Sequence, residues 1–530
     1  MTMMSTATIS LREDYWETFT LTDDDREFVY NYLLEIETPL TSPEILSALV
    51  NERIRKEKAA LEKQRTMGGD VYIPAHTYTA NQDLVFPALG WQHGRVVGIR
   101  PGKNPDLGNF QVIQVKFENH DTKEFASNIP NHILNQPQEI SIEESSLDAD
   151  LVMKNNGEEL LEIINSELTK NQEFVRIAGK WFPSALLVDI NVGHLNLVEA
   201  ILDMEGGGPS PTPPLLQQVG LASNANSKLV EFSLDHALQE DPRFDEVGPA
   251  GEVLWFLHRL EPESVLQTPP SLRYQPLEYD RALLTHDMLE LERILDDELT
   301  PTSGKYPNIN EVQLTLTFPH WRAGTLPLTA RMNHLFPTAY EAPRIRFRLV
   351  DGETGQKFPG WVVRTNHYVF GLQDWFKTRG LMPGSLIRVK RGKNPGEVIV
   401  QCEAQRGSRE WVRTVLVGSD GGIVFAMLKQ TITASYDERM AVAIPDPEGL
   451  EAAWKQIQKE RIPFERIVVN TVRDLAKLNP QSHVHASELY AAVNILRRCP
   501  PGPILALLAS RPWFIHVGDL HFRFDDAEKA

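Results

Sequence analysis

Two segments near the middle of the chain alternate strictly between apolar and polar residues. In EVQLTLTF, residues 311–318, every second residue from Val312 onward is apolar, and PRIRFRLV, residues 343–350, repeats the pattern. Because successive side chains of a β-strand point to opposite faces, this period of two predicts strands with one buried face. The other face of the second segment then carries a row of basic side chains, namely Arg344, Arg346 and Arg348.

The region around these strands differs in charge from the rest of the protein. From Glu341 to Val417 the sequence holds fourteen Lys and Arg but seven Asp and Glu, a net charge of +7, whereas the whole chain carries -19. A uniformly acidic protein repels nucleic acid. A local excess of positive charge in such a chain therefore indicates an anionic partner at this place.

At 530 residues the chain is too long for a single core and is expected to form roughly three to five domains. Its two cysteines, Cys402 and Cys499, support neither a disulfide framework nor a zinc cluster. We find no apolar stretch of signal-peptide length at the N-terminus and no apolar run long enough to span a bilayer. These features predict a soluble, cytoplasmic protein that could associate with the nucleoid.

The first part of the chain is expected to form two modules and a linker. Residues 1–90 combine two helices, the second capped at Ser42, with short strands, which predicts an N-terminal helical, winged-helix-like domain. Residues 91–137 contain the strands GRVVGI and FQVIQVKFE around a turn rich in Gly, Pro and Asn, which predicts a small β-barrel. The acidic stretch 138–149 is expected to be a linker.

Four further regions complete the predicted order. Residues 150–265 mix helices with short hairpins and hold nineteen Asp and Glu against seven Lys and Arg, so we expect an acidic winged-helix-like domain there. Residues 266–305 follow as a helical connector, and residues 306–417 form the basic β domain. Residues 418–530 end in three helices and a two-stranded hairpin, which together predict another winged helix.

The order of three helices followed by a hairpin resembles the HARE-type winged helix and the related domain of the bacterial RNA polymerase delta subunit. The likeness covers about sixty residues at the C-terminus and about forty around Ser227 to Arg259. The pattern of strands and turns in residues 91–137 resembles the small barrels of the KOW and Tudor-like families. These resemblances imply an α+β multidomain protein with winged helix-turn-helix units, a small KOW/Tudor-like β-barrel and a larger β-pseudobarrel.

A series of short landmarks runs in order through residues 309–404. They are Leu326-Pro327-Leu328, Leu335-Phe336-Pro337, Asp351-Gly352, Gly360-Trp361, Trp375-Phe376 and Pro383-Gly384-Ser385. In this order they resemble the DNA-binding pseudobarrel family of plant transcription factors. That family has an acidic residue where this chain has Ser385, so the resemblance bears more on the fold than on the function.

In that family two loops at one end of the barrel enter the major groove, and the resemblance places them at residues 320–325 and 364–368. Arg can bind guanine and Asn can bind adenine through two hydrogen bonds each, whereas nearby Lys and Arg bind phosphates of any sequence. The expected DNA contacts are Arg322, Thr325, Arg364, Thr365, Asn366, His367 and Tyr368 in the loops, with Lys377, Arg388, Lys390, Arg391 and Lys393 outside them.

Each of these assignments has a plainer alternative. Both loops could be ordinary polar loops, and the arginines of residues 343–350 could simply keep an edge strand soluble. The tryptophans of this region are expected in the core rather than as stacking surfaces, and they are Trp321, Trp361 and Trp375.

The sequence contains no P-loop, no nucleophile elbow and no H-E-x-x-H helix, and His483 and His485 have no Cys or acidic partner nearby in sequence for a metal. We therefore expect no catalysis, no cofactor and no metal. The expected function is transcription-associated binding of double-stranded DNA through the basic domain, while the acidic domain contacts a protein such as RNA polymerase. The alternative is an interaction scaffold or accessory subunit of a defence or repair complex, without direct DNA contact.

Overall fold

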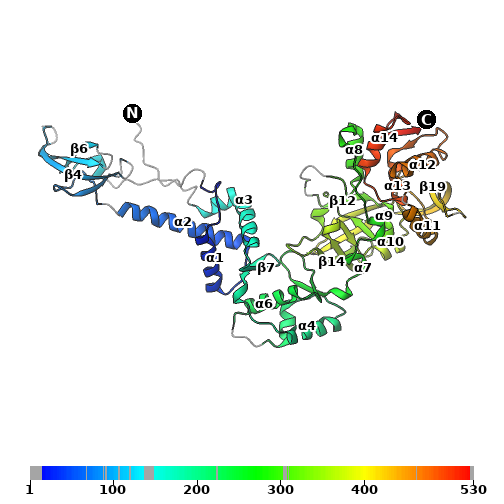
Figure 1. Ribbon diagram of the computed structural model, residues 1–530, viewed down its shortest axis with the longest axis horizontal. Coiled ribbons are helices and arrows are strands. Elements are labelled where there is room, and N and C mark those ends of the chain that lie inside the picture. The colour runs from blue at the N-terminus through cyan, green and yellow to red at the C-terminus, as the bar shows by residue number, and fades with distance from the viewer. Residues whose placement is uncertain are drawn as a thin grey trace. The chain divides into compact units, whose positions relative to one another are not determined.

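The computed structural model shows an α+β, multidomain protein (Figure 1). It describes residues 15–66, 69–86, 89, 92–104, 108–117, 121–135, 148–221, 225–301, 307, 309–394, 396–419, 421–460 and 462–525. Most of the predicted linker 138–149 lies outside these residues. The chain divides into two compact units, Met1–Val188 with Asn224–Phe232 and Asp189–Ser223 with Ser233–Ala530. Within the described ranges, no helix is both long enough and apolar enough to cross a membrane.

The first unit contains a helical module whose parts are far apart in the sequence. Its elements are α1 (Asp23–Ile36), β1 (Leu40–Thr41), α2 (Ser42–Thr66), α3 (Ala149–Lys170), β7 (Phe174–Ile177) and β8 (Lys180–Pro183). The strands form a sheet in the order β1-β8-β7, and all three helices share one apolar core with Trp181 and Phe182. The module predicted within residues 1–90 therefore takes its third helix and its hairpin from residues 149–183, across the predicted boundary at 150.

Between α2 and α3 the chain forms a five-stranded sheet. Its strands are β2 (Asp70–Val71), β3 (Asp83–Phe86), β4 (Gln92–Pro101), β5 (Gln111–Phe117) and β6 (Thr122–Ser127). They lie in sequence order, and every pair is antiparallel except β2 with β3. Leu84, Val96, Ile113 and Val115 are fully buried between them. The strands predicted in residues 91–137 are confirmed, although the sheet begins earlier, at Asp70.

The second unit includes two modules with the same order of elements as the helical module of the first. The earlier one comprises α4 (Val192–Met204), β9 (Ser210–Pro211), α5 (Thr212–Val219), α6 (Ser227–Glu240), β10 (Phe244–Glu246) and β11 (Leu254–Leu257), and the first part of α6 groups with the first unit. The C-terminal one comprises α12 (Phe464–Ala476), β21 (Val484–His485), α13 (Ala486–Leu496), α14 (Pro501–Ser510), β22 (Phe514–Gly518) and β23 (His521–Phe524).

The three modules share one sheet topology. In each, the short first strand pairs with the last strand of the hairpin, giving the orders β1-β8-β7, β9-β11-β10 and β21-β23-β22. In the first module, Trp181 Nε1 on that last strand donates to Ser42 Oγ at 2.9 Å, where α2 begins. In the second, Trp255 Nε1 donates to Thr212 Oγ1 at 3.2 Å, where α5 begins. A buried indole N–H thus ties the hairpin to the second helix.

The C-terminal module replaces this polar contact with an apolar one. Ala486 begins α13 and Phe522 pairs with Val484, so the two residues take the places of Ser42 and Trp181. Both side chains are buried, and neither carries a polar atom that needs a partner.

This comparison leads to a prediction for Ser42, which is itself buried. Changing Ser42→Ala should lower the free energy of unfolding of the first unit by about 1 to 2 kcal/mol, because the indole N–H of Trp181 loses its acceptor. Trp181→Phe should then cost less in the Ser42→Ala background than in the wild type. Urea unfolding followed by circular dichroism measures both effects. Strictly additive effects would mean that the hydrogen bond contributes nothing.

The basic region forms a seven-stranded sheet that curls into a half-barrel. Its strands and short helices are β12 (Glu311–Thr315), α9 (Phe318–Ala323), β13 (Thr325–Pro327), β14 (Arg344–Asp351), β15 (Lys357–Val363), η9 (Arg364–Asn366), β16 (Tyr368–Phe370), α10 (Gln373–Arg379), β17 (Leu386–Arg391) and β18 (Glu397–Cys402). The strand order is β12-β17-β18-β14-β15-β16-β13, and only β14 with β18 is parallel among these pairs. Val312, Ile345 and Leu349 are buried inside, which confirms the predicted alternation.

The remaining elements lie on either side of the half-barrel in the sequence. They are η5 (His258–Leu260), α7 (Glu263–Leu266), η6 (Pro270–Leu272), η7 (Arg281–Leu283) and α8 (His286–Leu295) before it, and β19 (Ala404–Val417), β20 (Ile423–Ala434) and α11 (Pro447–Glu460) after it. The basic domain was predicted to end at residue 417, where β19 ends. In the structure β19 is not a strand of the seven-stranded sheet, because it pairs with β20 as a long hairpin.

Candidate nucleic-acid interface

The first predicted DNA loop, residues 320–325, is mostly a helix. Residues 318–323 form α9, which ends at Gly324 in the left-handed conformation with φ 66°. Arg322 binds Glu451 through Nε and Nη2, which lie 3.0 and 2.7 Å from the same carboxylate oxygen. Thr325 is fully buried, and its hydroxyl is hydrogen-bonded to Nδ1 of His320 at 2.9 Å. The assignment of Thr325 as a DNA contact is therefore wrong, because its polar atom is bonded inside the protein.

The second predicted loop, residues 364–368, is exposed only in its middle. Thr365, Asn366 and His367 are exposed, whereas Arg364 is half-buried and donates from Nη1 to the carbonyl of Ala342 at 2.9 Å. Tyr368 is buried and its hydroxyl donates to the carbonyl of Ser264 at 2.7 Å. Burial disfavours the phenolate and raises the pKa of Tyr368 to about 12. The prediction for Tyr368 is wrong for the same reason as that for Thr325.

Most of the predicted phosphate contacts on the strands are bound within the protein. Arg388 lies between two carboxylates, with Nε 2.9 Å from Glu311 and Nη2 bonded to Glu403. Lys390 Nζ lies 3.2 Å from Glu311, and Arg391 donates to a backbone carbonyl, that of His334. Lys377 and Lys393 are exposed. These intramolecular partners neutralise much of the positive charge that the sequence assigns to the half-barrel.

The basic face of β14 is an internal contact. Arg344 binds Asp245 and also Glu261, with Nε 3.0 Å from the Glu261 carboxylate. The guanidinium of Arg346 lies over the ring of Trp361 at 5.0 Å, and burial lowers its pKa. Arg348 alone among the three arginines is exposed. Both predictions for this row, phosphate binding and solubility of an edge strand, are wrong for the first two arginines, because the acidic second module covers them.

Asp245, His258 and Glu261 form a group whose potential metal-binding atoms lie within 4.8 Å of one another. Arg344 binds both carboxylates of this group, so its guanidinium supplies the positive charge that a metal ion would bring. Burial is the main reason that the pKa of Glu261 is raised, to about 8. The residues therefore fit an ion-pair cluster better than a metal site.

A second carboxyl group at this contact leads to a prediction about pH. Burial raises the pKa of Glu246 from 4.5 to about 8, so the folded state keeps a proton that the unfolded state loses. The free energy of unfolding should therefore fall as the pH rises from about 5 to about 8. Glu246→Gln should reduce this fall by about 3 kcal/mol, whereas the exposed Glu252→Gln should not change it. Urea unfolding at a series of pH values tests this. Equal slopes for the wild type and Glu246→Gln would contradict it.

Three neighbouring hollows share lining residues and form one cleft, here called the basic cleft. Lys377 lines the first hollow. Arg322 lines both the first and the second, and Trp454 lines both the second and the third, which has a volume of about 910 Å³. One side is α11. The rest of the lining comes mainly from α9, α10 and residues 264–275, from residues 430–432 of β20, and from residues 462–467 and 497–498. Its charged side chains on the described surface are Arg273, Arg322, Lys377, Lys455, Lys459 and Arg497, with Arg498 buried beneath them and Glu451 as the single carboxylate.

The helix α11 contributes one face to the cleft. Glu451 and Lys455 are four residues apart, as are Trp454 and Gln458, so these two pairs lie on one side of the helix. Leu450, one turn before Trp454, is buried at the floor of the second hollow, and Ala453 is buried beside it. Lys455 Nζ lies 3.4 Å from Glu451, which also binds Arg322. The one carboxylate of the cleft is thus already shared between two cations.

The other cations leave their charge available to a ligand. Arg273 donates from Nε to the carbonyl of Thr268 at 2.9 Å, and Arg497 lies with its guanidinium 5.9 Å from the ring centre of Phe464. No ion pair joins Arg273, Lys459 or Arg497 to a carboxylate in the part of the chain that the structure describes. Gln275 and Gln458 add amide groups beside them.

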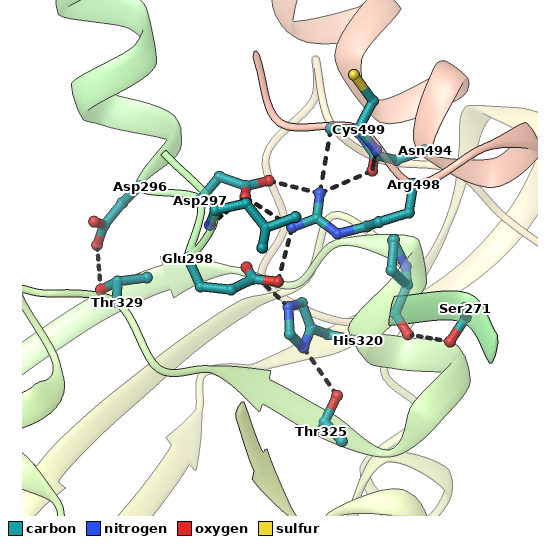
Figure 2. Close-up of polar contacts among 12 residues, drawn as sticks. Ser271, Asp296, Asp297, Glu298, His320, Thr325, Thr329, Asn494, Arg498 and Cys499 are labelled. Carbon is teal, nitrogen blue, oxygen red and sulfur yellow. Dashed lines mark hydrogen bonds and ion pairs between the residues drawn. The ribbon is translucent and has the colours of Figure 1, made fainter. Parts of the chain in front are cut away.

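A buried polar network joins α9 to the C-terminal module beneath the cleft (Figure 2). Arg498, next to Arg497 of the cleft, is 2% exposed and places Nη2 2.7 Å from both Asp297 and Glu298. His320, next to Trp321 and Arg322, places Nε2 3.2 Å from Glu298. Tyr490 of α13 donates its hydroxyl to Asp297 at 2.5 Å. The network therefore joins α9 of the half-barrel to the C-terminal module through residues 297–298.

Of the twelve predicted DNA contacts, the cleft brings together Arg322 and Lys377, and the others lie elsewhere. Arg273, Lys455, Lys459 and Arg497 were not predicted. The spacing of charged and aromatic residues in LEAAWKQIQKE, residues 450–460, is the sequence signal that could have indicated α11. The chain matches no known family model, no curated protein and no solved structure.

Proposed function

We propose that the protein is a non-enzymatic nucleic-acid-binding protein that binds phosphates in the basic cleft. The observation that carries the proposal is the charge of the cleft: its described lining has six surface cations and a single shared carboxylate, in a chain with a net charge of -19. Such a concentration of positive charge on an acidic protein favours an anionic ligand at one place and excludes it elsewhere.

The elements that carry these cations also suit phosphate binding. Arg322 projects from α9, Lys455 and Lys459 from α11, and Arg497 follows α13, so helices rather than long loops position them. The buried network around Arg498 holds α9 and α13 together. Preorganised cations lose little conformational entropy when a phosphate binds. We therefore place phosphate binding in the basic cleft rather than on the strands of the half-barrel.

We further propose that the three helical modules are winged helices used for protein contacts. In a DNA-reading winged helix the third helix enters the major groove and must tolerate phosphates. Here α3 carries five acidic residues and two lysines, α6 carries three and one, and α14 has no charged residue. These helices suit a protein partner, for which RNA polymerase is the candidate that the resemblance to its delta subunit gives. We also propose that the five-stranded sheet is a KOW/Tudor-like barrel and that the seven-stranded sheet is a pseudobarrel.

The test is a salt titration with the full chain. Fluorescence anisotropy of labelled oligonucleotides, single-stranded and duplex, gives the binding constant at each salt concentration. We expect its logarithm to fall linearly with the logarithm of the salt concentration, with a slope of about -3 to -5 for four to six neutralised phosphates. Absence of binding to either form at low salt would refute the proposal and favour the scaffold.

A further inference from the structure

We infer that the basic cleft takes a single strand of nucleic acid, with an unstacked base against Trp454 and the adjoining phosphates on the cations of α11 and Arg497. This inference rests on the proposed function and specifies its ligand. It depends on Trp454, whose ring lies where an apolar hollow meets a basic one.

Trp454 lines both of these hollows. The apolar one, of about 420 Å³, is lined by Phe318, Phe370, Leu450 and prolines 269 and 270. The basic one, of about 910 Å³, contains Lys455, Lys459 and Arg497 and has no carboxylate among its described lining residues. Trp454 is half-buried, so part of its ring remains available for contact. Proteins that bind single strands combine aromatic side chains, on which the bases stack, with cations that follow the phosphate backbone of the nucleic acid.

The apolar hollow also offers polar groups for the edge of a base. Arg322 and Gln373 line it, and the guanidinium of Arg322 is held by Glu451 at 2.7 Å. A base that stacks on Trp454 would therefore meet hydrogen-bond donors and acceptors in the same hollow. Such edges are accessible when a base is unstacked and splayed out of its strand.

A duplex fits this site poorly. Its phosphates lie on a convex surface, and its bases are covered by their stacked neighbours, so a ring on the wall of a hollow cannot reach them without opening the helix. Trp454 is half-buried, and the cations beside it line a hollow, so the site favours the single strand.

The experiment compares a labelled mixed-sequence 20-mer as a single strand and as a duplex, at one salt concentration, with the full chain and two variants. We expect the single strand to bind at least about tenfold more tightly than the duplex. Trp454→Ala should weaken its binding by about fivefold to a hundredfold, whereas Trp454→Phe, which keeps a ring, should retain most of it. Residual duplex binding should respond to neither variant.

Each other outcome has a definite meaning. Equal or tighter binding of the duplex would overturn the single-strand inference and leave the proposed function standing. Trp454→Phe as weak as Trp454→Ala would overturn the stacking contact, and the wild-type comparison remains decisive even if one variant misfolds. If the wild-type protein binds neither the single strand nor the duplex, the proposed function itself is refuted.

Discussion

Replacing four cations of the basic cleft by glutamine should weaken nucleic-acid binding by about a thousandfold. The variant carries Arg273→Gln, Lys455→Gln, Lys459→Gln and Arg497→Gln, all of which line the widest hollow. Each lost contact between a cation and a phosphate should cost about 1 kcal/mol or more, and 1.4 kcal/mol corresponds to a tenfold change in affinity. The salt slope should also become shallower by about 3, because fewer counterions are released on binding. Anisotropy titrations over a range of salt concentrations measure both quantities.

The control variant removes the same number of charges away from the cleft. Arg348, Lys393, Arg409 and Arg523 are exposed, and none of them lines the three hollows. Replacing all four by glutamine changes the net charge equally but should alter the affinity by less than about tenfold. Equal losses in the two variants would show that only the overall charge matters and that the cleft is not the binding site. Because Lys393 belongs to the contacts predicted for the half-barrel, the control also tests that prediction.

Arg498→Met should lower the free energy of unfolding of the second unit by about 3 to 5 kcal/mol, because it leaves two carboxylates buried without their cation. Arg498 is 2% exposed, and Asp297 and Glu298 beside it are 1% and 5% exposed. Burial opposes the ionisation of Glu298, but Arg498 and His320 keep its pKa below the usual range. The same burial, reinforced by Asp297, raises the pKa of Tyr490 well above its usual value. Removing the guanidinium therefore removes the charge that balances the whole network.

The neighbouring residue supplies a matched control for this prediction. Arg497→Met should leave the stability within about 1 kcal/mol of the wild type, because Arg497 is outside the buried network, but it should weaken nucleic-acid binding. Urea unfolding, combined with hydrogen exchange of the amides in α13 and α14, distinguishes the two variants. If Arg498→Met is as stable as Arg497→Met, the network does not hold α9 and the C-terminal module together.

Local patterns predicted the elements of this fold well, because they depend on neighbours in the sequence. The period of two placed Val312 and Ile345 inside the half-barrel, and Trp361 and Trp375 are buried as the plainer alternative expected. The helical module of the first unit crosses the predicted boundary at 150, because local patterns show the strands between α2 and α3 but not that these two helices share one core. Periodicity also shows which face a residue shares but not what covers that face. Arg344 therefore seemed exposed, although Asp245, about a hundred residues earlier, binds it.

The interface was harder to predict because its residues come from distant segments. The cations of the cleft lie between residues 273 and 497, and only those of α11 are neighbours in the sequence. Thr325 and Tyr368 are polar residues of a type that often contacts DNA, yet their hydroxyl groups satisfy bonds inside the protein. Residue type alone cannot distinguish these two situations, since it does not reveal the partner.

Ultraviolet cross-linking locates the bound nucleic acid most directly. A photoreactive oligonucleotide is cross-linked to the full chain, and the modified peptides are identified by mass spectrometry. Cross-links should concentrate in residues 447–460, 270–275 and 497, and a fully complementary unlabelled competitor strand should reduce them by converting the probe to a duplex. Cross-links confined to residues 364–368 or to the five-stranded sheet of the first unit would place the nucleic acid outside the basic cleft and contradict the account.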